Sequence, residues 1–380
     1  MDFRMDKEHL LLQQMYREFV EKEVAPLAAE VDETEEAPMA TVEKLAKYGF
    51  LGIPNAKEYG GQGGDYIAYV MAVEELAKAC ATTSVIVSAH TSLGVGAIYE
   101  NGTKEQKEKY LPDLLSGKKI GAFGLTEPGA GTDAAGQQTI AVLDGDEYVI
   151  NGTKIFITNA GFADVFVIFA MTDKSQGTRG ITAFIIEKGT PGFKIGAPEK
   201  KMGIRGSSTC ELIFENARIP KENMLGREGK GFGLAMKTLD GGRIGIAAQA
   251  VGIAQGAIDE TVKYTSERKQ FGRRISQFQN TQFELADMQA KVDAARLLVY
   301  RAADAKQNKE PFGHYAAMAK LVAAETASDV TRRCLQLYGG YGYTRDYPIE
   351  RMMRDAKITE IYEGTSEVQR MVIAGWMGVK

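Results

Sequence analysis

At residues 124–133 the chain reads GLTEPGAGTD, and this glycine-rich stretch lies where the pattern of apolar residues changes. Before it, apolar residues recur at spacings of three and four, as Leu12, Met15 and Phe19 do, which is typical of amphipathic helices. After it, short β-branched and aromatic runs alternate with turn residues, as in strands. The stretch therefore marks a boundary between a helical region and a β region.

The region from about residue 121 to residue 230 has the pattern of a small all-β unit. We expect strands at several short runs, with turns such as Asn151-Gly152 and Pro191-Gly192 between them. A small β-barrel or β-sandwich satisfies this pattern. The runs are 148–150, 155–158, 165–171, 181–187 and 212–214.

Helical periodicity returns after about residue 231. Apolar residues with alternating spacings of three and four predict the buried seam of a bundle helix; they are Leu285, Met288, Val292, Ala295, Val299 and Ala302. The segment 244–258 is rich in Ala and Gly, which lets neighbouring helices pack closely. The sequence thus predicts an α+β multidomain chain with an N-terminal all-α domain (1–120), a middle β domain (121–230) and a C-terminal four-helix-bundle domain (231–380).

The composition is that of an ordinary globular protein. Hydrophobic residues make up 44% and charged residues 25% of the 380 residues, so the chain can bury large cores. The 46 Lys and Arg against 50 Asp and Glu give a formal charge of -4, with no basic excess to hold a phosphate backbone. We therefore expect no nucleic-acid partner.

Cysteine, histidine and the N-terminus indicate a soluble protein of a reducing compartment. The three Cys are scattered without CxxC spacing and there are only three His, so we expect no disulfide framework and no metal site. The first residues, MDFRMD, alternate charged and apolar side chains and lack the apolar core of a signal peptide. No apolar run approaches the roughly 18 residues of a membrane span, so we expect a cytoplasmic location.

Glycine is in excess. It accounts for 42 of 380 residues, about 11% against a usual ~7%, while Pro is only 10. Such an excess indicates positions where the backbone turns sharply or approaches another group closely. In the stretch 124–133, small residues and hydroxyls offer backbone N–H and side-chain OH groups to an anion or a heteroaromatic edge. A simple interdomain turn explains the same stretch, so both interpretations stay open.

Three further strings admit a ligand-binding interpretation. Phe156 and Thr158 lie two residues apart and so share one face of a strand, which suits a planar ligand, although strand aromatics are usually core. The basic string 268–274 (RKQFGRR) matches a phosphate clamp, although a charge run is usually a solvated face. The string 336–343 (QLYGGYGY) contains three Gly where a helix stop needs one, which favours close approach to a ligand.

Glu363, in the string IYEGTSE (361–367), is a candidate base. The Ile and Tyr before it and the Gly after it can keep the carboxylate from water. Desolvation raises the pKa of a carboxyl group and makes it a more capable base, whereas most glutamates are simply exposed. The chain has no Walker A loop and no GxGxxG strand–helix unit, so the two commonest nucleotide fingerprints are missing.

Taken together and in this order, the strings resemble one family over the whole chain. The chain resembles the acyl-CoA dehydrogenases, close to the bacterial short-chain (butyryl-CoA) enzymes and related enoyl-CoA reductases. Both long signatures of that family are present, at 124–136 and 336–355, and the strings MGIRG (202–206) and LDGGR (239–243) match its short-chain branch. The resemblance implies an FAD cofactor bound between the β domain and helices rather than on a Rossmann sheet.

The resemblance also implies the chemistry. Glu363 matches the base that removes the pro-R α-proton of the acyl thioester, while the β-hydride passes to N5 of FAD and a trans-2-enoyl-CoA results. Phe156 stands where the family often has Trp, and Thr158 would hydrogen-bond near flavin N5. The loop that meets the flavin and its pyrophosphate corresponds to Phe123, Leu125, Thr126, Gly131 and Thr132.

Further positions match family contacts to cofactor and substrate. Thr365 and Glu367 match flavin contacts. The residues that match contacts on the substrate side are Thr132, Asp240, Arg243 and Gly364. Those that match positions reaching the FAD of a neighbouring subunit are Arg268, Gln270, Phe278, Gln279, Gln336, Gly339 and Gly340. The implied partners are an electron-transferring flavoprotein and the other copies of a homotetramer.

Three functions stay open at this level. The first is a short-chain acyl-CoA dehydrogenase, or the reverse enoyl-CoA reductase. The second is a reductase of a bulkier or aromatic enoyl-CoA such as caffeyl-CoA, because the small residues of Gly94-Val95-Gly96-Ala97 leave room in a segment that lines the acyl pocket of relatives. Close helix packing is the commoner reason for such small residues. The third is a non-catalytic subunit that binds CoA or flavin.

Overall fold

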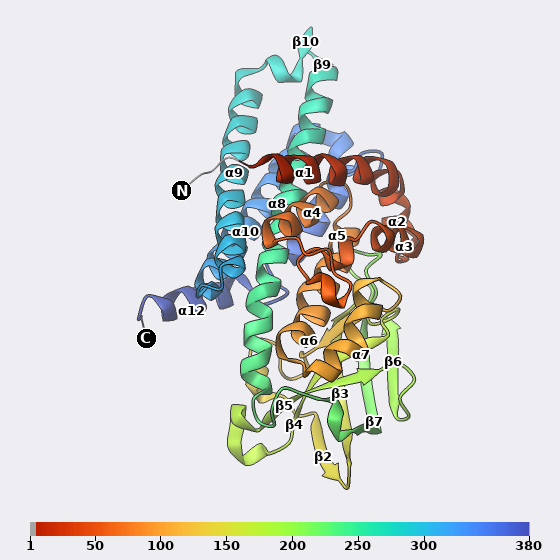
Figure 1. Cartoon of the computed structure of the whole chain (residues 1–380). Coiled ribbons are helices and arrows are strands. Elements are labelled where there is room, and N and C mark those ends of the chain that lie inside the picture. Colours follow the sequence, from red (N-terminus) through yellow and green to blue (C-terminus); the bar gives the residue numbers. More distant parts are fainter. Residues whose placement is uncertain (1–4, 380) are drawn as a thin grey trace.

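The computed structural model describes residues 5–379 and shows three parts that follow one another along the chain (Figure 1). The N-terminal part is helical, the middle part is a β-sheet, and the C-terminal part is again helical. The predicted order of helical, β and helical parts is therefore confirmed. Of the predicted N-terminal segment MDFRMD, residues 1–4 lie outside the described residues.

Capped helices build the N-terminal part. The side chain of Asp6 accepts a hydrogen bond from His9 N–H at 2.9 Å at the start of α1, and that of Asp65 accepts one from Ala68 N–H at 2.7 Å at the start of α4. The helices are α1 Lys7–Phe19, α2 Ala28–Thr34, α3 Met39–Lys47, α4 Tyr66–Ala79, α5 Ala81–Ser88, α6 Gly96–Asn101 and α7 Lys104–Leu115.

Helices α5 and α6 join through π-helical turns at Ala89–Val95 into one helical stretch, Ala81–Asn101. Among residues 5–379 this 21-residue stretch is the one helix long and apolar enough to cross a membrane by length and composition. The apolar run is thus longer than expected from the sequence. However, 94% of its apolar window is buried inside the structure, as in a core helix.

The middle part is one sheet with the strand order β6-β7-β3-β2-β4-β5-β8, and β1 pairs in parallel with β4. Strand β4 is buried along its whole length, which explains its unbroken run of apolar residues. The strands are β1 Gly121–Gly124, β2 Ile140–Asp144, β3 Glu147–Thr158, β4 Val165–Met171, β5 Ile181–Glu187, β6 Phe193–Pro198, β7 Thr209–Pro220 and β8 Met224–Leu225.

The predicted turn at Asn151-Gly152 is wrong. Both residues lie inside β3, where the register against β7 shifts at Gly152. Gly152 has a φ of 147° and lies so close to Thr139 that an added Cβ would overlap the threonine side chain. Gly152 therefore allows the strand to lie close to Thr139 and its pairing with β7 to shift, and it does not reverse the chain.

Three long helices dominate the C-terminal part, and the predicted seam of α9 is confirmed, because its residues from Met288 to Ala302 are buried while Leu285 is partly buried. Helix α8 runs from the β domain to the hairpin β9–β10 at the far end (Figure 1). The elements are α8 Gly231–Glu267, β9 Lys269–Gln270, β10 Arg273–Arg274, α9 Gln279–Gln307, α10 Gly313–Tyr338, α11 Ile349–Ile358 and α12 Ser366–Trp376.

Helix α8 also packs along α4 and so joins the N-terminal helices to the bundle. Two glycines of α8 allow this approach. A Cβ at Gly252 would collide with the carbonyl oxygen of Glu74, and one at Gly256 with that of Lys78. The predicted close packing of the Ala- and Gly-rich segment 244–258 is thus confirmed.

All three parts meet at Arg354 on α11. Its guanidinium pairs with Asp32 of the N-terminal part at 2.6 Å and with Glu350 of its own helix at 2.7 Å. It also donates to the carbonyl oxygen of Met202 in the middle part at 3.0 Å. Next to it, a carboxylate oxygen of Asp355 accepts the N–H of Ile204 at 2.5 Å. One arginine thus contacts every part of the chain.

Candidate active site

The loop between α11 and α12 directs Glu363 into the interior. The backbone is left-handed at Glu363 (φ 52°) and at Gly364 (φ 92°), a conformation that is unusual for Glu and easy for Gly. Glu363 Oε2 is buried and has no hydrogen-bond partner among the described residues. Because buried polar groups are normally paired, this carboxyl group is positioned for a group that the chain itself does not supply.

Helix α8 passes directly beside this carboxyl group. Gly242 makes the passage possible, because an added Cβ would overlap Glu363 Oε2 and lie 2.8 Å from a methyl group of Leu93. The next residue, Arg243, donates from Nε to the carbonyl oxygen of Glu363 at 3.4 Å and pairs through Nη1 with Asp240 at 2.6 Å. The predicted substrate-side residues of α8 therefore lie against the loop that carries the candidate base.

Burial raises the pKa of Glu363 to about 8, and the cations of Lys320 and Arg243 oppose this rise. Burial also raises the pKa of Asp240, which its partner Arg243 opposes. Glu363 Oε2 is shielded from water, as predicted for this carboxyl group, although the residue as a whole is partly buried. A carboxyl group with a raised pKa can exchange a proton near neutral pH, as a general base must.

The glycine-rich stretch 124–133 is anchored from below by a buried lysine of β3. Lys154 Nζ donates to the carbonyl oxygen of Leu125 at 3.2 Å and pairs with Glu127 at 2.7 Å. Glu127 also accepts the N–H of Thr139 at 3.0 Å. The Glu127 carboxylate therefore ties the stretch to Lys154 of β3 and to the backbone at Thr139. Sequence reasoning missed this pair, although a Lys in the middle of an apolar strand is a signal, since buried charges need partners.

The outer side of the same stretch is open. Nothing lies within 4 Å of a Cβ added at Gly129 or Gly131, so a ligand can reach the backbone there. On the adjoining strand, Phe156 is 59% exposed and has a φ of 59°, which differs from the core position usual for a strand aromatic. The ring of Phe123 instead packs on Phe169, with ring centroids 5.0 Å apart.

A cavity of about 530 Å³ lies where α8 and α10 end, beside the hairpin β9–β10. Gly339 has a φ of 61°, and nothing lies within 4 Å of a Cβ added at Gly339 or Gly340. The guanidinium of Arg268, which lines the cavity, lies over the ring of Tyr341, 5.3 Å from the ring centroid. The cavity brings together five predicted cofactor residues, namely Arg268, Gln270, Gln336, Gly339 and Gly340.

The remaining predicted residues lie outside that cavity. Thr365 caps α12, where its hydroxyl accepts the N–H of Val368 at 3.3 Å, and Glu367 lies exposed in the first turn of that helix. Phe278 lies under the guanidinium of Arg273 at 4.0 Å, and Gln279 begins α9. The predicted residues thus lie in separate places: at the Glu363 loop, along the stretch 124–133 with Phe156 nearby, and at the cavity at the end of α8.

Family models for the acyl-CoA dehydrogenase N-terminal, middle and C-terminal domains match residues 6–118, 122–217 and 229–378. The chain belongs to the acyl-CoA dehydrogenase family.

Curated relatives in this family match the chain over almost its full length. The chain is 64% identical over 99% of its length to a short-chain specific acyl-CoA dehydrogenase of Clostridium acetobutylicum, of which it covers 99%. It is 53% identical over 98% of its length to an acryloyl-CoA reductase (NADH) of Anaerotignum propionicum, of which it covers 95%.

Solved structures of relatives superpose closely. Butyryl-CoA dehydrogenase of Megasphaera elsdenii has a TM-score of 0.97 at 51% identity, covering 99% of this chain and 100% of that one. A chain from work on the electron transferring flavoprotein of Acidaminococcus fermentans and flavin-based electron bifurcation has a TM-score of 0.98 at 54% identity, with 99% of each chain covered. An acyl-CoA dehydrogenase of Bacillus anthracis complexed with FAD has a TM-score of 0.92 at 34% identity, covering 98% of this chain and 67% of that one.

Like the rest of the acyl-CoA dehydrogenase family, the chain is a flavin-dependent oxidoreductase with FAD as its cofactor. The residues present fit this cofactor. The open backbone at Gly129 and Gly131, the exposed ring of Phe156 and the glycine-lined cavity at Gly339 offer N–H groups, an aromatic face and space. The expectations of an acyl-CoA dehydrogenase fold and an FAD cofactor are confirmed.

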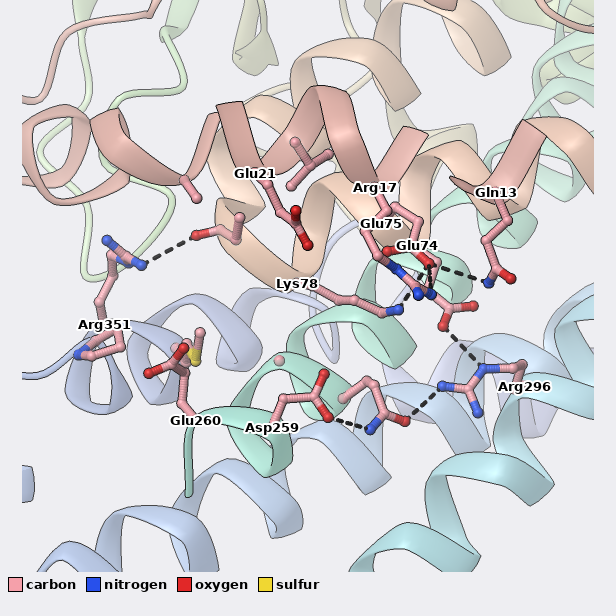
Figure 2. Close-up of a pocket in the computed structure, with 17 residues that line it drawn as sticks. Gln13, Arg17, Glu21, Glu74, Glu75, Lys78, Asp259, Glu260, Arg296 and Arg351 are labelled. Carbon is pink, nitrogen blue, oxygen red and sulfur yellow. Dashed lines mark hydrogen bonds and ion pairs between the residues drawn. The ribbon is translucent and has the colours of Figure 1, made fainter. Parts of the chain in front are cut away.

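Another cavity, of about 790 Å³, lies away from the predicted site residues (Figure 2). It lies among α1, α4, α8, α9 and α11, and no predicted site residue lines it. Several of its charged side chains pair with one another: Glu75 with Lys78 at 2.9 Å, and Glu74 with Arg296 at 3.0 Å. We interpret it as a polar seam between the N-terminal and C-terminal helices.

Gly94, one of the small residues that suggested a roomy acyl pocket, packs against β1. An added Cβ would lie 2.9 Å from the backbone carbon of Gly121, whereas one at Gly96 would meet only the carbonyl oxygen of Thr91 at 3.4 Å. The first of these glycines therefore allows a helix to approach a strand. This observation favours the packing interpretation of Gly94.

Replacing Lys154 with Met should loosen the anchored stretch 124–133. The change leaves Glu127 buried without its cation, and removing one partner of a buried ion pair costs about 3–5 kcal/mol. We expect a lower urea midpoint and weaker FAD retention, measured by urea unfolding and by flavin fluorescence. The double variant Lys154→Met/Glu127→Gln, which has no orphaned charge, should recover much of the stability but not the FAD affinity. Wild-type FAD affinity in Lys154→Met would contradict the anchoring role.

Proposed function

We propose that this chain catalyses the FAD-dependent α,β-dehydrogenation of a short-chain acyl-CoA, or the reverse reduction of a 2-enoyl-CoA, with Glu363 as the base at the α-carbon. The observation that carries the proposal is the buried carboxyl group of Glu363, which has no partner, has a raised pKa and lies beside the backbone of Gly242. Such a group is suited to accept a proton from a bound thioester.

The residues of the chain divide the work. The Glu363 carboxylate takes the α-proton, and the left-handed Gly364 leaves the loop backbone open to the thioester. The N–H of Glu363 makes no hydrogen bond among residues 5–379, so it is available to the thioester carbonyl as negative charge develops there. FAD, when bound, accepts the β-hydrogen as hydride. The packed helices around the loop shield Oε2 of the carboxyl group from water.

The separation of the cofactor residues supports an assembly of at least two copies, which is consistent with the homotetramer that we propose. Between Gly242 beside the base and Glu267 at the end of α8, 25 residues of helix span about 38 Å. That is longer than one dinucleotide, so the cavity at Gly339 and the base of the same chain are best served by different cofactors. A second copy that places its cavity near the first copy's stretch 124–133 satisfies both groups.

We further propose an electron-transferring flavoprotein as the redox partner and the cytoplasm as the location. The relative from Acidaminococcus fermentans, which comes from work on such a flavoprotein, supports the partner. The bacterial relatives from Clostridium and Megasphaera support the location. A non-catalytic subunit is not favoured, because the unpartnered base and its glycine are in place.

The direct test is an anaerobic titration of the FAD-loaded protein with butyryl-CoA, crotonyl-CoA and caffeyl-CoA. We expect a small molar excess of butyryl-CoA to bleach the flavin absorbance, and caffeyl-CoA to leave the chemically reduced protein unchanged. Crotonyl-CoA should reoxidise the chemically reduced protein. Reoxidation by caffeyl-CoA alone would instead support the aromatic enoyl-CoA reductase, whereas no response to any thioester would contradict the proposed function.

A further inference from the structure

Lys320, in the middle of α10, is a fully buried ammonium group. Its Nζ donates to the carbonyl oxygen of Gly364 at 2.7 Å, and Gln369 Nε2 donates to the same oxygen at 2.7 Å. Within the described residues no carboxylate lies within the 4.0 Å of an ion pair with Lys320. A buried cation without a counter-ion is costly, and burial accordingly lowers the pKa of Lys320 to about 8, while nearby carboxylates oppose this lowering.

The charges around the loop identify that counter-charge. Arg243 is already neutralised by Asp240 at 2.6 Å. The carboxylate left over is Glu363, whose charge is the largest influence that offsets burial at Lys320. Lys320 and Arg243 are in turn the two cations that act on Glu363. The pairing of Arg243 with Asp240 thus leaves Lys320 and Glu363 as the uncompensated opposite charges of this buried group.

We propose that Lys320 is a positioning residue that keeps Glu363 ionisable despite its burial and holds the Gly364 carbonyl, so that the base points toward the gap at Gly242. The inference rests on the proposed role of Glu363 and extends it. When Glu363 accepts the substrate proton, the anion beside Lys320 disappears, so the lysine charge favours return of that proton and resets the base.

Other titratable groups around Glu363 do not explain the same effect. Helix α8 contributes Arg243 and Asp240, which offset each other. Helix α4 contributes Tyr69, whose pKa is raised above 10 by burial, so it stays neutral near pH 8. Tyr362, next to the base, donates a hydrogen bond to Gln249, and burial raises its pKa as well. On the loop and α12, Glu360 and Glu367 are anions whose pKa values are lowered, so neither supplies a positive charge.

The test compares Lys320→Met, Lys320→Gln and Lys320→Arg as FAD-loaded proteins with butyryl-CoA. The pKa that governs kcat/KM should rise by about 1–3 units in Met and Gln, because an opposite charge is removed, and should stay near wild type in Arg. At pH 7 this corresponds to a kcat/KM lower by about tenfold or more. The Gln variant keeps a donor for Gly364, so it separates the charge from the hydrogen bond. Unchanged pH profiles in folded Met or Gln variants would overturn the proposal.

A matched control is Lys201→Met. This lysine is partly buried and, like Lys320, donates to backbone carbonyls, among them Ser207 at 2.8 Å, but it contacts no residue of the Glu363 loop. It should lose stability without shifting the pH profile. A second readout needs no substrate: the pH dependence of unfolding, compared between each background and its Glu363→Gln derivative, reports the pKa of Glu363. A Lys320-dependent shift there with no turnover in wild type would reject the proposed function while keeping the pairing.

Discussion

Glu363→Gln is expected to lower turnover of butyryl-CoA by about 10³-fold while leaving FAD bound, because a positioned base contributes roughly 10²–10⁴-fold. Glutamine has the size of glutamate and fits the gap beside Gly242, yet it accepts no proton. Flavin bleaching on anaerobic mixing with the thioester measures the step directly. Butyryl-CoA should still bind, so KM should change little compared with kcat.

The control for this substitution is Glu325→Gln. Glu325 is an exposed carboxylate of α10 that pairs with Arg370 at 2.6 Å, outside the proposed site. It should retain wild-type turnover. If Glu363→Gln kept more than a tenth of wild-type activity, another residue would have to be the base.

The same substitution should change the response to pH. In the wild-type protein kcat/KM should increase as pH rises toward about 8, because only the ionised form of Glu363 accepts the proton. The free energy of unfolding should instead decrease as pH rises. The folded-state pKa lies above the ordinary 4.5, so the folded state binds the extra proton, and this contribution is lost as pH rises from 4.5 through about 8. Urea unfolding should therefore show Glu363→Gln losing less stability than wild type over this interval.

Gly242→Ala should lower kcat by about 10²-fold, since a displacement of about 1 Å at a reacting group has an effect of this size. The added methyl group would overlap Glu363 Oε2 and press on Leu93, so the carboxyl group has to move. The change is otherwise mild for α8, because Ala favours helix by about 1 kcal/mol over Gly. Single-turnover flavin reduction measures the loss, and FAD content should equal that of wild type.

Gly233→Ala provides the comparison on the same helix. Nothing lies within 4 Å of a Cβ added at Gly233, so this variant should gain stability and keep full activity. Equal activity of the two variants would mean that the carboxyl group of Glu363 does not depend on the gap at Gly242.

The fold was largely predictable, because periods of two and of three to four residues report strands and helices directly. The turn expected at Asn151-Gly152 failed for a physical reason. A glycine that turns the chain and a glycine that admits a neighbouring strand look alike in sequence, and only the proximity of Thr139 separates them. The length of the apolar run at Ala81–Asn101 was likewise hidden by the hydroxyl residues within it.

The candidate site was predictable at its centre and less so around it. Glu363 stands in a recognisable string, and its burial follows from its neighbours. The buried positions of Lys154 and Lys320 could not be predicted in this way. Their partners in the folded chain lie 27 residues away for Lys154 and 44 residues away for Lys320. A carbonyl oxygen as partner leaves no trace in the sequence at all. Buried positioning residues therefore emerge only when the chain is folded.

The contacts of Arg354 with Asp32, Met202 and Glu350 bear on how the chain melts. Arg354 joins three segments that are matched by separate family models. Moving the N-terminal segment away breaks the Arg354–Asp32 ion pair, and moving the middle segment away leaves a guanidinium N–H without its acceptor, the Met202 carbonyl. Heat should thus unfold the whole chain in one cooperative calorimetric transition, and the middle segment produced alone should be a poor folding unit. In evolution, one of the three segments therefore cannot be exchanged alone unless the new segment again provides a partner for Arg354.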